Sequence, residues 1–371
     1  MNILIANRRL TDYSGTEVVS RDLAIGLKAL GHAPVVWAPR LGGIAREIRD
    51  AGIAVHGDVR AVGDVPDVIH GNHPKVLLES LLRFPGVPAV AVCHDGSSVR
   101  DEPFFHPRIL RYVAVDERCR RRIERQAQIP RERIEVHLNA IDLGRFRPRA
   151  ILPETPSTAL VFSNYATTST YLPALRRACR RAAIRLDVLG GDDSRQTPHP
   201  EAVLGRYDVV FAKARCALEA MAVGCAVVLC DFAGLGPLVT AAAFDDLRAN
   251  NFGQAVLARP HTASGVLAEL RRYDAADAAR VSSRVREEAG WDRSLPRWVS
   301  LYEDVVREHA RGGPAPGAEH AALLDYLQSW SYEARMDWER AQIAGLARVP
   351  LVGATLVPLA KYVLRQWSRK S

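Results

Sequence analysis

The chain has 371 residues, of which 48% are hydrophobic and 25% are charged. This balance is typical of a folded protein and excludes disordered, fibrous and collagen-like chains, and the length predicts about two domains with an appendage. No run of about 18 uninterrupted apolar residues is present, which excludes a polytopic membrane protein. The sequence begins without a charged leader or a cleavage site, so we expect a cytoplasmic protein.

The formal net charge of +8 does not by itself predict nucleic-acid binding. Only five of the 50 basic residues are lysines, which favours a codon bias toward arginine. In the basic segment 116–126, arginines and glutamates face one another at i,i+4, as they do on a solvated helix face. We therefore expect no nucleic-acid partner, and an anionic membrane surface is the more natural partner of a basic patch. The six cysteines lack metal-site spacing, so we expect reduced, mostly buried thiols and no metal.

Apolar runs alternate with amphipathic stretches over the first 150 residues. A helix follows the first strand; Ser14 and Glu17 have the spacing of a capping box, and Gly31 would end the helix. Strands are expected at 3–6, 35–38, 53–56, 68–70, 89–94 and 112–115, and further helices at 43–51, after Pro74 and at 116–126. This alternation predicts an α/β domain over residues 1–150, with a doubly wound, Rossmann-like parallel sheet.

A second domain of the same class is expected over residues 151–310. Three prolines near residue 150 mark a linker, after which strands are expected at 159–163, 185–189, 208–212 and 226–230, and helices at 172–183, 216–223 and 291–309. Two open sheets of this kind hold ligands in a cleft at the carboxyl ends of their strands.

The remaining segment, 311–371, is predicted to be a linker and a helical tail. It begins with GGPAPG at 312–317, and it holds three of the six tryptophans, Trp330, Trp338 and Trp367. Residues 346–364 are mostly apolar but are interrupted by Pro350 and Pro358, which makes them too broken to span a bilayer. Residues 318–371 therefore either lie on a membrane surface, at the inner face of the membrane, or pack on the body or on a second copy as a homodimer.

Polar residues follow several predicted strands of the first domain, where a cleft would lie. Gly15 and Thr16 stand at a helix N-terminus, where backbone amides suit a phosphate, although a capped helix with a flexible loop explains them equally well. His94 and Asp95 follow the strand that ends near Cys93, and a functional role for that histidine is favoured. A similar group follows the strand at 68–70 and is either functional or a turn: His70, Asn72 and His73.

Several segments resemble glycosyltransferase family 4 proteins of the GT-B fold. Residues 139–148 (NAIDLGRFRP) and 218–228 (LEAMAVGCAVV) are similar to two of that family's specific segments, NGVDxxxFxP and LEAMAxGxPVV. The opening residues 1–40 and residues 113–117 (VAVDE) also look like the family, so that the resemblance covers residues 1–308.

The resemblance implies a nucleotide-sugar-dependent transferase without a further cofactor, with the donor on the second domain and the acceptor on the first. Carried over by position, Glu219 would bind the donor ribose hydroxyls. The alternative is that Glu219 has only a structural role, as an acidic residue that complements the helix dipole. His94 would touch the donor sugar, and the implied donor site would also include Gly15, Thr16, Asn139, Gly234 and Leu235, the last two in a glycine loop near the diphosphate. The implied acceptor side contains His70, Asn72, His73 and Asp95. The family mostly retains the anomeric configuration and needs no protein nucleophile.

Two departures from the family pattern concern the donor site. Phe211 stands where the partner of Glu219 would be a glutamate, and residues 163–167 (SNYAT) replace the segment that supplies an arginine and a lysine to the diphosphate. Lys213 is the only lysine between residues 76 and 360, and Arg215 lies beside it. We hypothesise that Lys213 and Arg215 replace the missing pair, against the alternative of plain surface charge.

The favoured function is therefore a hexosyltransferase, expected to retain configuration and to need no metal, because no D-x-D motif is present. Its acceptor is a glycan, a lipid-linked acceptor or a small molecule. The first alternative is a catalytically silent GT-B subunit that binds a partner enzyme, which the changed donor motifs favour. The second alternative is another GT-B enzyme, such as a nucleotide-sugar epimerase. The resemblance of the first domain to family 4 makes this alternative less favoured.

Overall fold

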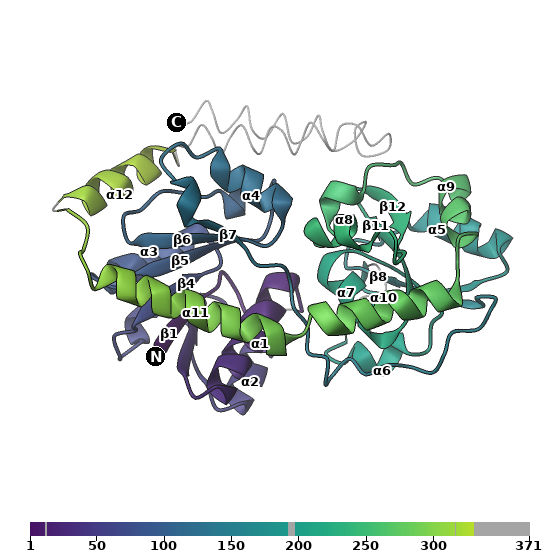
Figure 1. The fold of residues 1–371 in the computed structure, drawn as a ribbon, viewed down its shortest axis with the longest axis horizontal. Coiled ribbons are helices and arrows are strands. Elements are labelled where there is room, and N and C mark those ends of the chain that lie inside the picture. Colours follow the sequence, from purple (N-terminus) through teal and green to yellow (C-terminus); the bar gives the residue numbers. More distant parts are fainter. Residues whose placement is uncertain (12, 192–196, 316, 330–371) are drawn as a thin grey trace, which may run out of the picture. The chain divides into compact units, whose positions relative to one another are not determined.

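The computed structural model describes residues 1–11, 13–191, 197–315 and 317–329. The chain divides into two compact units, Met1–Pro103 with Arg108–Gly313 and Phe104–Pro107 with Pro314–Ser371. The first unit contains two lobes, each built on its own β-sheet (Figure 1). We name them the N-lobe and the C-lobe.

The N-lobe holds a sheet of seven parallel strands in the order β3-β2-β1-β4-β5-β6-β7. The strands are β1 Asn2–Ala6, β2 Ala33–Trp37, β3 Ala54–His56, β4 Val68–Gly71, β5 Ala89–Cys93, β6 Ile109–Ala114 and β7 Ile134–Val136. The connecting helices are α1 Gly15–Ala29, α2 Gly43–Asp50, α3 Pro74–Arg83 and α4 Glu117–Glu124. The inner strands β1 and β4 are buried nearly throughout, which is typical of a parallel sheet covered on both faces.

The C-lobe sheet has five strands in the order β12-β11-β10-β8-β9, and only β12 runs antiparallel to its neighbour. The strands are β8 Thr158–Phe162, β9 Arg185–Leu189, β10 Val209–Ala212, β11 Ala226–Asp231 and β12 Gly234–Leu238. The helices are α5 Leu172–Arg181, α6 Glu201–Leu204, α7 Ala214–Val223, α8 Phe244–Ala249, α9 Ala263–Leu270 and α10 Ala275–Glu288.

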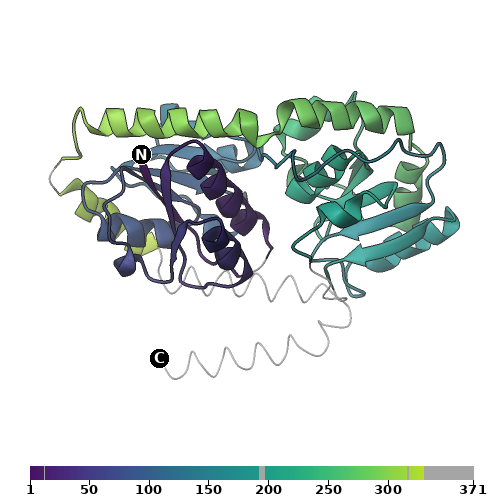
Figure 2. The same ribbon diagram turned by 90° about the horizontal axis from the view of Figure 1, so that it is seen from below.

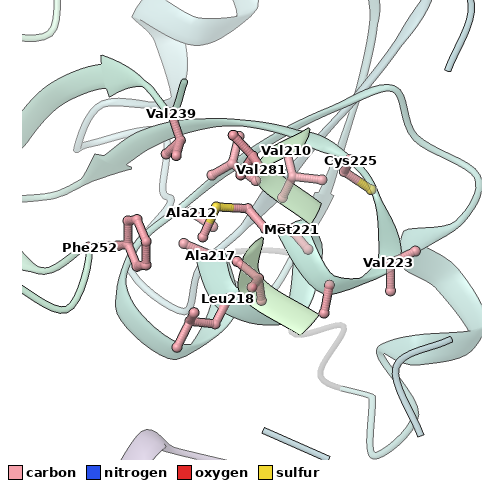
Figure 3. Close-up of a cluster of buried hydrophobic side chains, with 14 of the residues drawn as sticks. Val210, Ala212, Ala217, Leu218, Met221, Val223, Cys225, Val239, Phe252 and Val281 are labelled. Carbon is pink, nitrogen blue, oxygen red and sulfur yellow. The ribbon is translucent and has the colours of Figure 1, made fainter. Parts of the chain in front are cut away.

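Two apolar clusters cover the faces of the C-lobe sheet. One joins alternate residues of β10 and β11 to α7 and α10 and includes Val210, Met221 and Val281 (Figure 3). The other joins the remaining strand residues to α5 and α9. Because both faces are filled, the carboxyl edge of the sheet is the place left for polar chemistry.

The long helix α11, Trp291–His309, links the two lobes. It follows α10 in the chain but contacts β4, β5, β6 and α1 of the N-lobe. Figure 2 shows α10 beside the C-lobe and α11 along the N-lobe. The ring of Trp298 on α11 lies 5.1 Å from that of His70 and 4.6 Å from that of His137, measured between centroids. The end of the second lobe's sequence therefore completes the core of the first.

The second unit contains helix α12, Ala318–Ser329, and the short segment 104–107. The ring of Tyr326 lies 4.6 Å from that of Phe104, and Glu319 lies 3.9 Å from the ring nitrogen of His106. Among the described residues, no helix is long and apolar enough to cross a membrane. The predicted membrane or dimer contact of the tail falls mostly on residues 330–371, which lie outside the described part.

The sequence-based α/β expectation is confirmed, with two Rossmann-like sheets in one chain. The capping box at α1 is wrong in detail, because the Ser14 hydroxyl donates to the Glu17 carboxylate (2.8 Å) and not to the helix backbone. The six cysteines are free, and five of them are buried. The sequence reading did not identify β7, β12, α6, α8, α9 or α10.

Candidate functional site

Two adjoining hollows lie between the start of α1 on the N-lobe and the start of α7 on the C-lobe. The larger has a volume of about 290 Å³. Both are lined by Gly15 and Arg215, and the smaller reaches Glu219. Of the residues predicted from the sequence, the larger hollow also has Thr16, His94, Asp95, Asn139 and Lys213 on its walls. Most of the predicted site residues thus meet in one cleft.

The start of α7 is aimed at this cleft by the strand before it. Strand β10 ends at Ala212, Lys213 is the N-cap, and Ala214 has a left-handed φ of +47°. The Ala214 N–H donates to the Phe252 carbonyl (2.8 Å), and Phe252 itself has a positive φ. Backbone strain of this kind is retained where the surroundings enforce it, and it is concentrated at functional sites.

Lys213 lies in a pocket of aromatic rings and one buried carboxylate. Its ammonium group forms an ion pair with Asp231, whose side chain is fully buried. The ammonium nitrogen is 5.6 Å from the ring centre of Tyr165 and 5.3 Å from that of Phe232. Because an ammonium group has three donors and the Lys213 side chain is 24% exposed, it can bind Asp231 and still offer a donor to a ligand in the larger hollow.

Arg215 is buried, and each of its three guanidinium nitrogens has a partner in the protein. Its Nε donates to Glu219 (2.8 Å), one terminal nitrogen donates to the Ala140 carbonyl (3.2 Å), and the other pairs with Asp22 of α1. The prediction that Arg215 binds phosphate is not tested, but its role in this structure is an ion pair across the cleft. Asp22 also pairs with Arg21 (2.7 Å).

Glu219 lines the smaller hollow and keeps one carboxylate oxygen available. Oε1 accepts from Arg215, and Oε2 accepts no hydrogen bond from the described residues. Burial raises the pKa of Glu219, although the neighbouring guanidinium opposes this, whereas the two arginines beside Asp22 outweigh its burial and lower its pKa. A carboxylate held in this way can accept hydroxyl protons, which is the predicted contact with a ribose.

Gly15 begins α1 at the wall shared by both hollows. A Cβ atom built at this position would meet no heavy atom within 4 Å, and its φ is not positive. The fold therefore does not require glycine here. Thr16 is fixed beside it, because its carbonyl accepts from Asn7 Nδ2 (3.1 Å) and from the Ser20 hydroxyl (2.9 Å).

We expect Gly15→Ala to leave the chain folded and to weaken ligand binding. Alanine raises helix propensity by about 0.5–1 kcal/mol relative to glycine, so the free energy of unfolding stays equal or rises. The added methyl group points into the cleft and is expected to lower the affinity for a nucleoside diphosphate. Gly63→Ala is the control, because a Cβ there is also unobstructed and the position is outside the cleft. Equal affinities for the two variants would contradict a ligand at Gly15.

A hydrogen-bonded chain of side chains supports His94. Asn72 Nδ2 donates to the Ala6 carbonyl (3.1 Å), which turns Oδ1 toward two histidines. That oxygen accepts from His94 Nε2 (2.8 Å) and from His70 Nε2 (3.2 Å), so both rings carry their proton on Nε2. The Tyr302 hydroxyl then donates to His70 Nδ1 (2.7 Å). His94 therefore keeps Nδ1 as a hydrogen-bond acceptor, and the residue lines the larger hollow.

His70 and Asn72 lie behind this wall. His70 is 1% exposed and Asn72 is 0% exposed, so they position His94 in this structure, and their predicted acceptor contacts stay untested. Burial lowers the pKa of both His70 and His94 to about 3, which keeps them neutral at physiological pH.

Asp95 closes a turn beside the larger hollow. Its Oδ1 accepts from the backbone N–H groups of Ser97 (2.7 Å) and Ser98 (2.9 Å). Burial raises the pKa of Asp95, but these hydrogen bonds outweigh it and hold the pKa below its usual value. Asp95 is therefore ionised and accepts hydrogen bonds from the backbone of its own turn. It stabilises that turn and is also a candidate contact for the acceptor substrate.

Three predicted features lie elsewhere in the structure. Gly234 and Leu235 do not form a glycine loop but begin strand β12, with Leu235 fully buried, and neither lines the two hollows. Phe211 is wholly buried in β10 and packs in the apolar cluster on the α5 side. The expectation of a loop at residue 234 is therefore wrong, and position 211 belongs to the core.

Some cleft residues were not identified from the sequence. Tyr165 and Arg118 line the larger hollow, and Arg118 donates to Gln254 across the lobes (2.9 Å). Tyr165 follows β8 in the segment that departs from the family pattern, so its position could have been noticed. The sequence does not predict that Asp22 lies at the cleft, because its pattern is that of a surface residue on an amphipathic helix.

His73 lies 3.9 Å from Asp101, and its ring centre is 6.4 Å from that of His94. It is buried and does not line the two hollows. In the described part of the chain, no group of three or more His, Cys, Asp or Glu side chains could hold a metal ion. Metal independence itself stays a prediction.

The comparisons with known proteins agree with this architecture. The model of Glycosyltransferase Family 4 matches residues 59–145. A glycosyltransferase from Rickettsia africae is similar with a TM-score of 0.59 at 13% identity, covering 82% of this chain and 98% of that one. Anabaena HepE in complex with UDP has a TM-score of 0.57 at 14% identity, covering 82% of this chain and 100% of that one.

A third solved structure, the sucrose-phosphate synthase of Thermosynechococcus elongatus, has a TM-score of 0.54 at 14% identity and covers 83% of this chain and 99% of that one. A search of curated proteins finds no match to the sequence. At these identities the structural likeness shows the fold, and the family model and the sequence motifs point in the same direction. The chain therefore has the GT-B fold of these glycosyltransferases, and its residues 59–145 are similar to Glycosyltransferase Family 4.

Proposed function

We propose that the chain is a glycosyltransferase that takes a hexose from a nucleoside diphosphate sugar bound in the cleft. One observation carries this proposal: Lys213 and Glu219, at the start and in the middle of α7, open into adjoining hollows that also contain Gly15 at the start of α1. A cation, a carboxylate and two helix N-termini are the groups that a diphosphate and a ribose require.

The C-lobe is proposed to hold the donor. The ammonium group of Lys213 and the first N–H groups of α7 would face the diphosphate, and Glu219 Oε2 would accept from the ribose. Asn139 lines the larger hollow, and its carbonyl and N–H are fixed by Arg248 (2.9 Å) and Asn251 (3.3 Å). Anabaena HepE, which shares the fold, is described in complex with UDP and with UDP and glucose, so UDP is the first nucleotide to try.

The proposed reaction exchanges one bond at the anomeric carbon for another. The bond from that carbon to the diphosphate oxygen breaks, and the electron pair leaves with the diphosphate. A bond to an acceptor hydroxyl oxygen forms, and the hydroxyl proton passes to the departing diphosphate oxygen. Lys213 and the helix N-termini would stabilise the growing negative charge, which is the usual source of rate enhancement in such sites. We propose retention of configuration and no metal, as the family resemblance implies.

The acceptor is proposed to enter from the N-lobe, where His94 and Asp95 face the larger hollow. It would be a glycan, a lipid-linked acceptor or a small molecule. We further propose a cytoplasmic location at the inner face of the membrane, with contact through the tail at 318–371. Flotation of the chain with liposomes, with and without that tail, tests the contact.

The proposal is tested by thermal unfolding in the presence of UDP, GDP and ADP, each compared with its nucleoside. A ligand present at about 100 times its Kd adds about 2.7 kcal/mol to the free energy of unfolding, which is a readily measured shift. We expect one diphosphate to raise the melting temperature more than its nucleoside does. If none of them raises it, the donor site is refuted.

A catalytically silent subunit is the second candidate function, and specific observations favour it. Arg215 has protein partners at all three nitrogens, Lys213 is already paired with Asp231, and Phe211 supplies no carboxylate. This alternative predicts that the chain binds no nucleotide, or binds one without releasing the nucleoside diphosphate when a nucleoside diphosphate sugar is supplied.

A further inference from the structure

A basic cluster lies beside the cleft at the carboxyl edge of the N-lobe sheet. Its members come from the loops after four neighbouring strands, since Arg8 and Arg9 follow β1, Arg40 follows β2, His73 follows β4 and Arg100 follows β5. Burial and then repulsion from Arg100 and the other two arginines lower the pKa of Arg8. Four guanidinium groups therefore converge on one edge.

The cluster has few acidic partners among the described residues. Arg9 pairs with Glu17 (2.8 Å), but the side chains of Arg8, Arg40 and Arg100 form no ion pair or hydrogen bond with the described part of the chain. The carboxyl group of Asp101 also lies in this cluster, and burial and then repulsion from Asp95 raise its pKa to about 7. The described residues thus do not neutralise the excess of positive charge.

Buried polar atoms without partners lie within this cluster. Arg8 Nε, His73 Nδ1 and Asp101 Oδ1 are each buried and lack a hydrogen-bond partner in the described part of the chain. The side chain of His73 is only 10% exposed. Unpaired buried nitrogens beside converging positive charges are costly in a free protein, and an anion with several oxygens would satisfy them.

Helix α3 adds to the positive potential at the same place. His73 is its N-cap residue but makes no side-chain capping bond, so the first turn keeps free N–H groups. The positive end of the helix dipole therefore faces the side of the cluster where His73 lies.

We propose that this basic cluster binds a phosphate group carried by the acceptor. The inference rests on the proposed function for its assignment to the acceptor and deepens it by naming a substrate class. His73 connects the cluster to the cleft, because its ring lies 6.4 Å from that of His94, which lines the larger hollow. A molecule with its phosphate at Arg8 and Arg100 would place its remaining atoms toward the hollow where transfer occurs.

The phosphate has two possible sources, a soluble phosphorylated sugar and a phospholipid headgroup, and the experiment separates them. The full chain is titrated calorimetrically with glucose 6-phosphate and with glucose at one ionic strength. In a second arm it is sedimented with phosphatidylcholine vesicles that either contain or lack phosphatidic acid. We expect the chain to bind glucose 6-phosphate, vesicles with phosphatidic acid, or both, because each carries a phosphomonoester. We expect it to bind neither glucose nor vesicles that lack phosphatidic acid.

Variants then locate the site. Arg8→Gln and Arg100→Gln are each expected to weaken the phosphate-dependent binding about tenfold or more, since each removes a charge-assisted contact. Arg180→Gln is the matched control, because Arg180 is an exposed arginine on α5 of the C-lobe and loses the same charge. Glucose 6-phosphate and phosphatidic acid vesicles that both fail to bind would overturn the proposal, as would an equal loss for Arg180→Gln.

UDP affinity distinguishes this inference from the proposed function. Both arginine variants are expected to bind UDP as the unchanged chain does, because neither residue lines the two hollows. If UDP and other nucleoside diphosphates fail to bind while the phosphate probe binds at the cluster, the donor proposal fails and the anion site stands.

Discussion

Replacing Arg215 by methionine is expected to lower the free energy of unfolding by about 3–5 kcal/mol, the cost of removing one partner from a buried ion pair. The guanidinium lies between Glu219 of its own helix and Asp22 of the N-lobe, and both carboxylates are nearly enclosed, with side-chain exposures of 7% and 9%. Without Arg215, Glu219 loses the one ion pair that it forms within the described part of the chain. Asp22 then keeps its ion pair with Arg21 as the remaining one among the described residues.

Urea unfolding measures this loss, and three further variants show its origin: Arg177→Met, Asp22→Asn and the double variant Asp22→Asn with Arg215→Met. Arg177→Met is the control, because Arg177 is exposed on α5 and its side chain forms no hydrogen bond or ion pair with the described residues; we expect a change within about 0.5 kcal/mol. Adding Asp22→Asn to Arg215→Met is expected to recover part of the loss, because one uncompensated carboxylate is removed. A double variant that loses the sum of the two single losses would contradict a direct interaction across the cleft.

Acidification is expected to destabilise the N-lobe steeply. Burial lowers the pKa values of His70, His73 and His94 to about 3, against about 6.5 for an unfolded histidine. Their contribution is therefore fully present above pH 6.5 and is lost as the pH falls toward 3. Asp101 acts in the opposite direction, since its raised pKa of about 7 makes the folded state hold a proton that the unfolded state releases above about pH 4.

Near pH 5, unfolding takes up three protons at the histidines and releases one at Asp101. The net uptake of about two protons predicts that the free energy of unfolding falls by about 2.7 kcal/mol for each pH unit below 6. Urea titrations at a series of pH values measure the slope. His70→Gln should reduce it by about one proton, whereas His320→Gln, at an exposed position of α12, should leave it unchanged. A flat profile in the unchanged chain would show that these rings are not buried as neutral groups.

The alternation of apolar runs made the fold predictable. Strands such as 3–6 and 226–230 are continuous apolar stretches, and the structure places them in parallel sheets. The antiparallel strand β12 could not be predicted in the same way, because its sequence, GLGPL, carries two glycines and a proline that indicate a turn. It is a strand because Leu235 and Leu238 pack beneath α9, which is a tertiary effect.

The candidate site was predictable where the residues follow strand ends or helix starts. Gly15, His94 and Lys213 were identified in this way, and Glu219 was identified from the family resemblance; all four line the hollows. The partnership of Arg215 with Asp22 was not predictable, because it joins residues 193 positions apart on different lobes. The basic cluster was missed for a similar reason, since Arg8, Arg40 and Arg100 meet only when the parallel strand order brings their loops to one edge.

The most direct measurement is a calorimetric titration of the chain and of Lys213→Gln with the best-bound nucleoside diphosphate and with its nucleoside. Glutamine keeps a hydrogen-bond donor for Asp231 but removes the charge, and Lys75→Gln on the exposed face of α3 is the control. We predict that Lys213→Gln weakens the diphosphate about 10- to 100-fold and leaves the nucleoside and the control unchanged. Equal losses for diphosphate and nucleoside, or no loss for either, would contradict a diphosphate held at Lys213 between the two lobes.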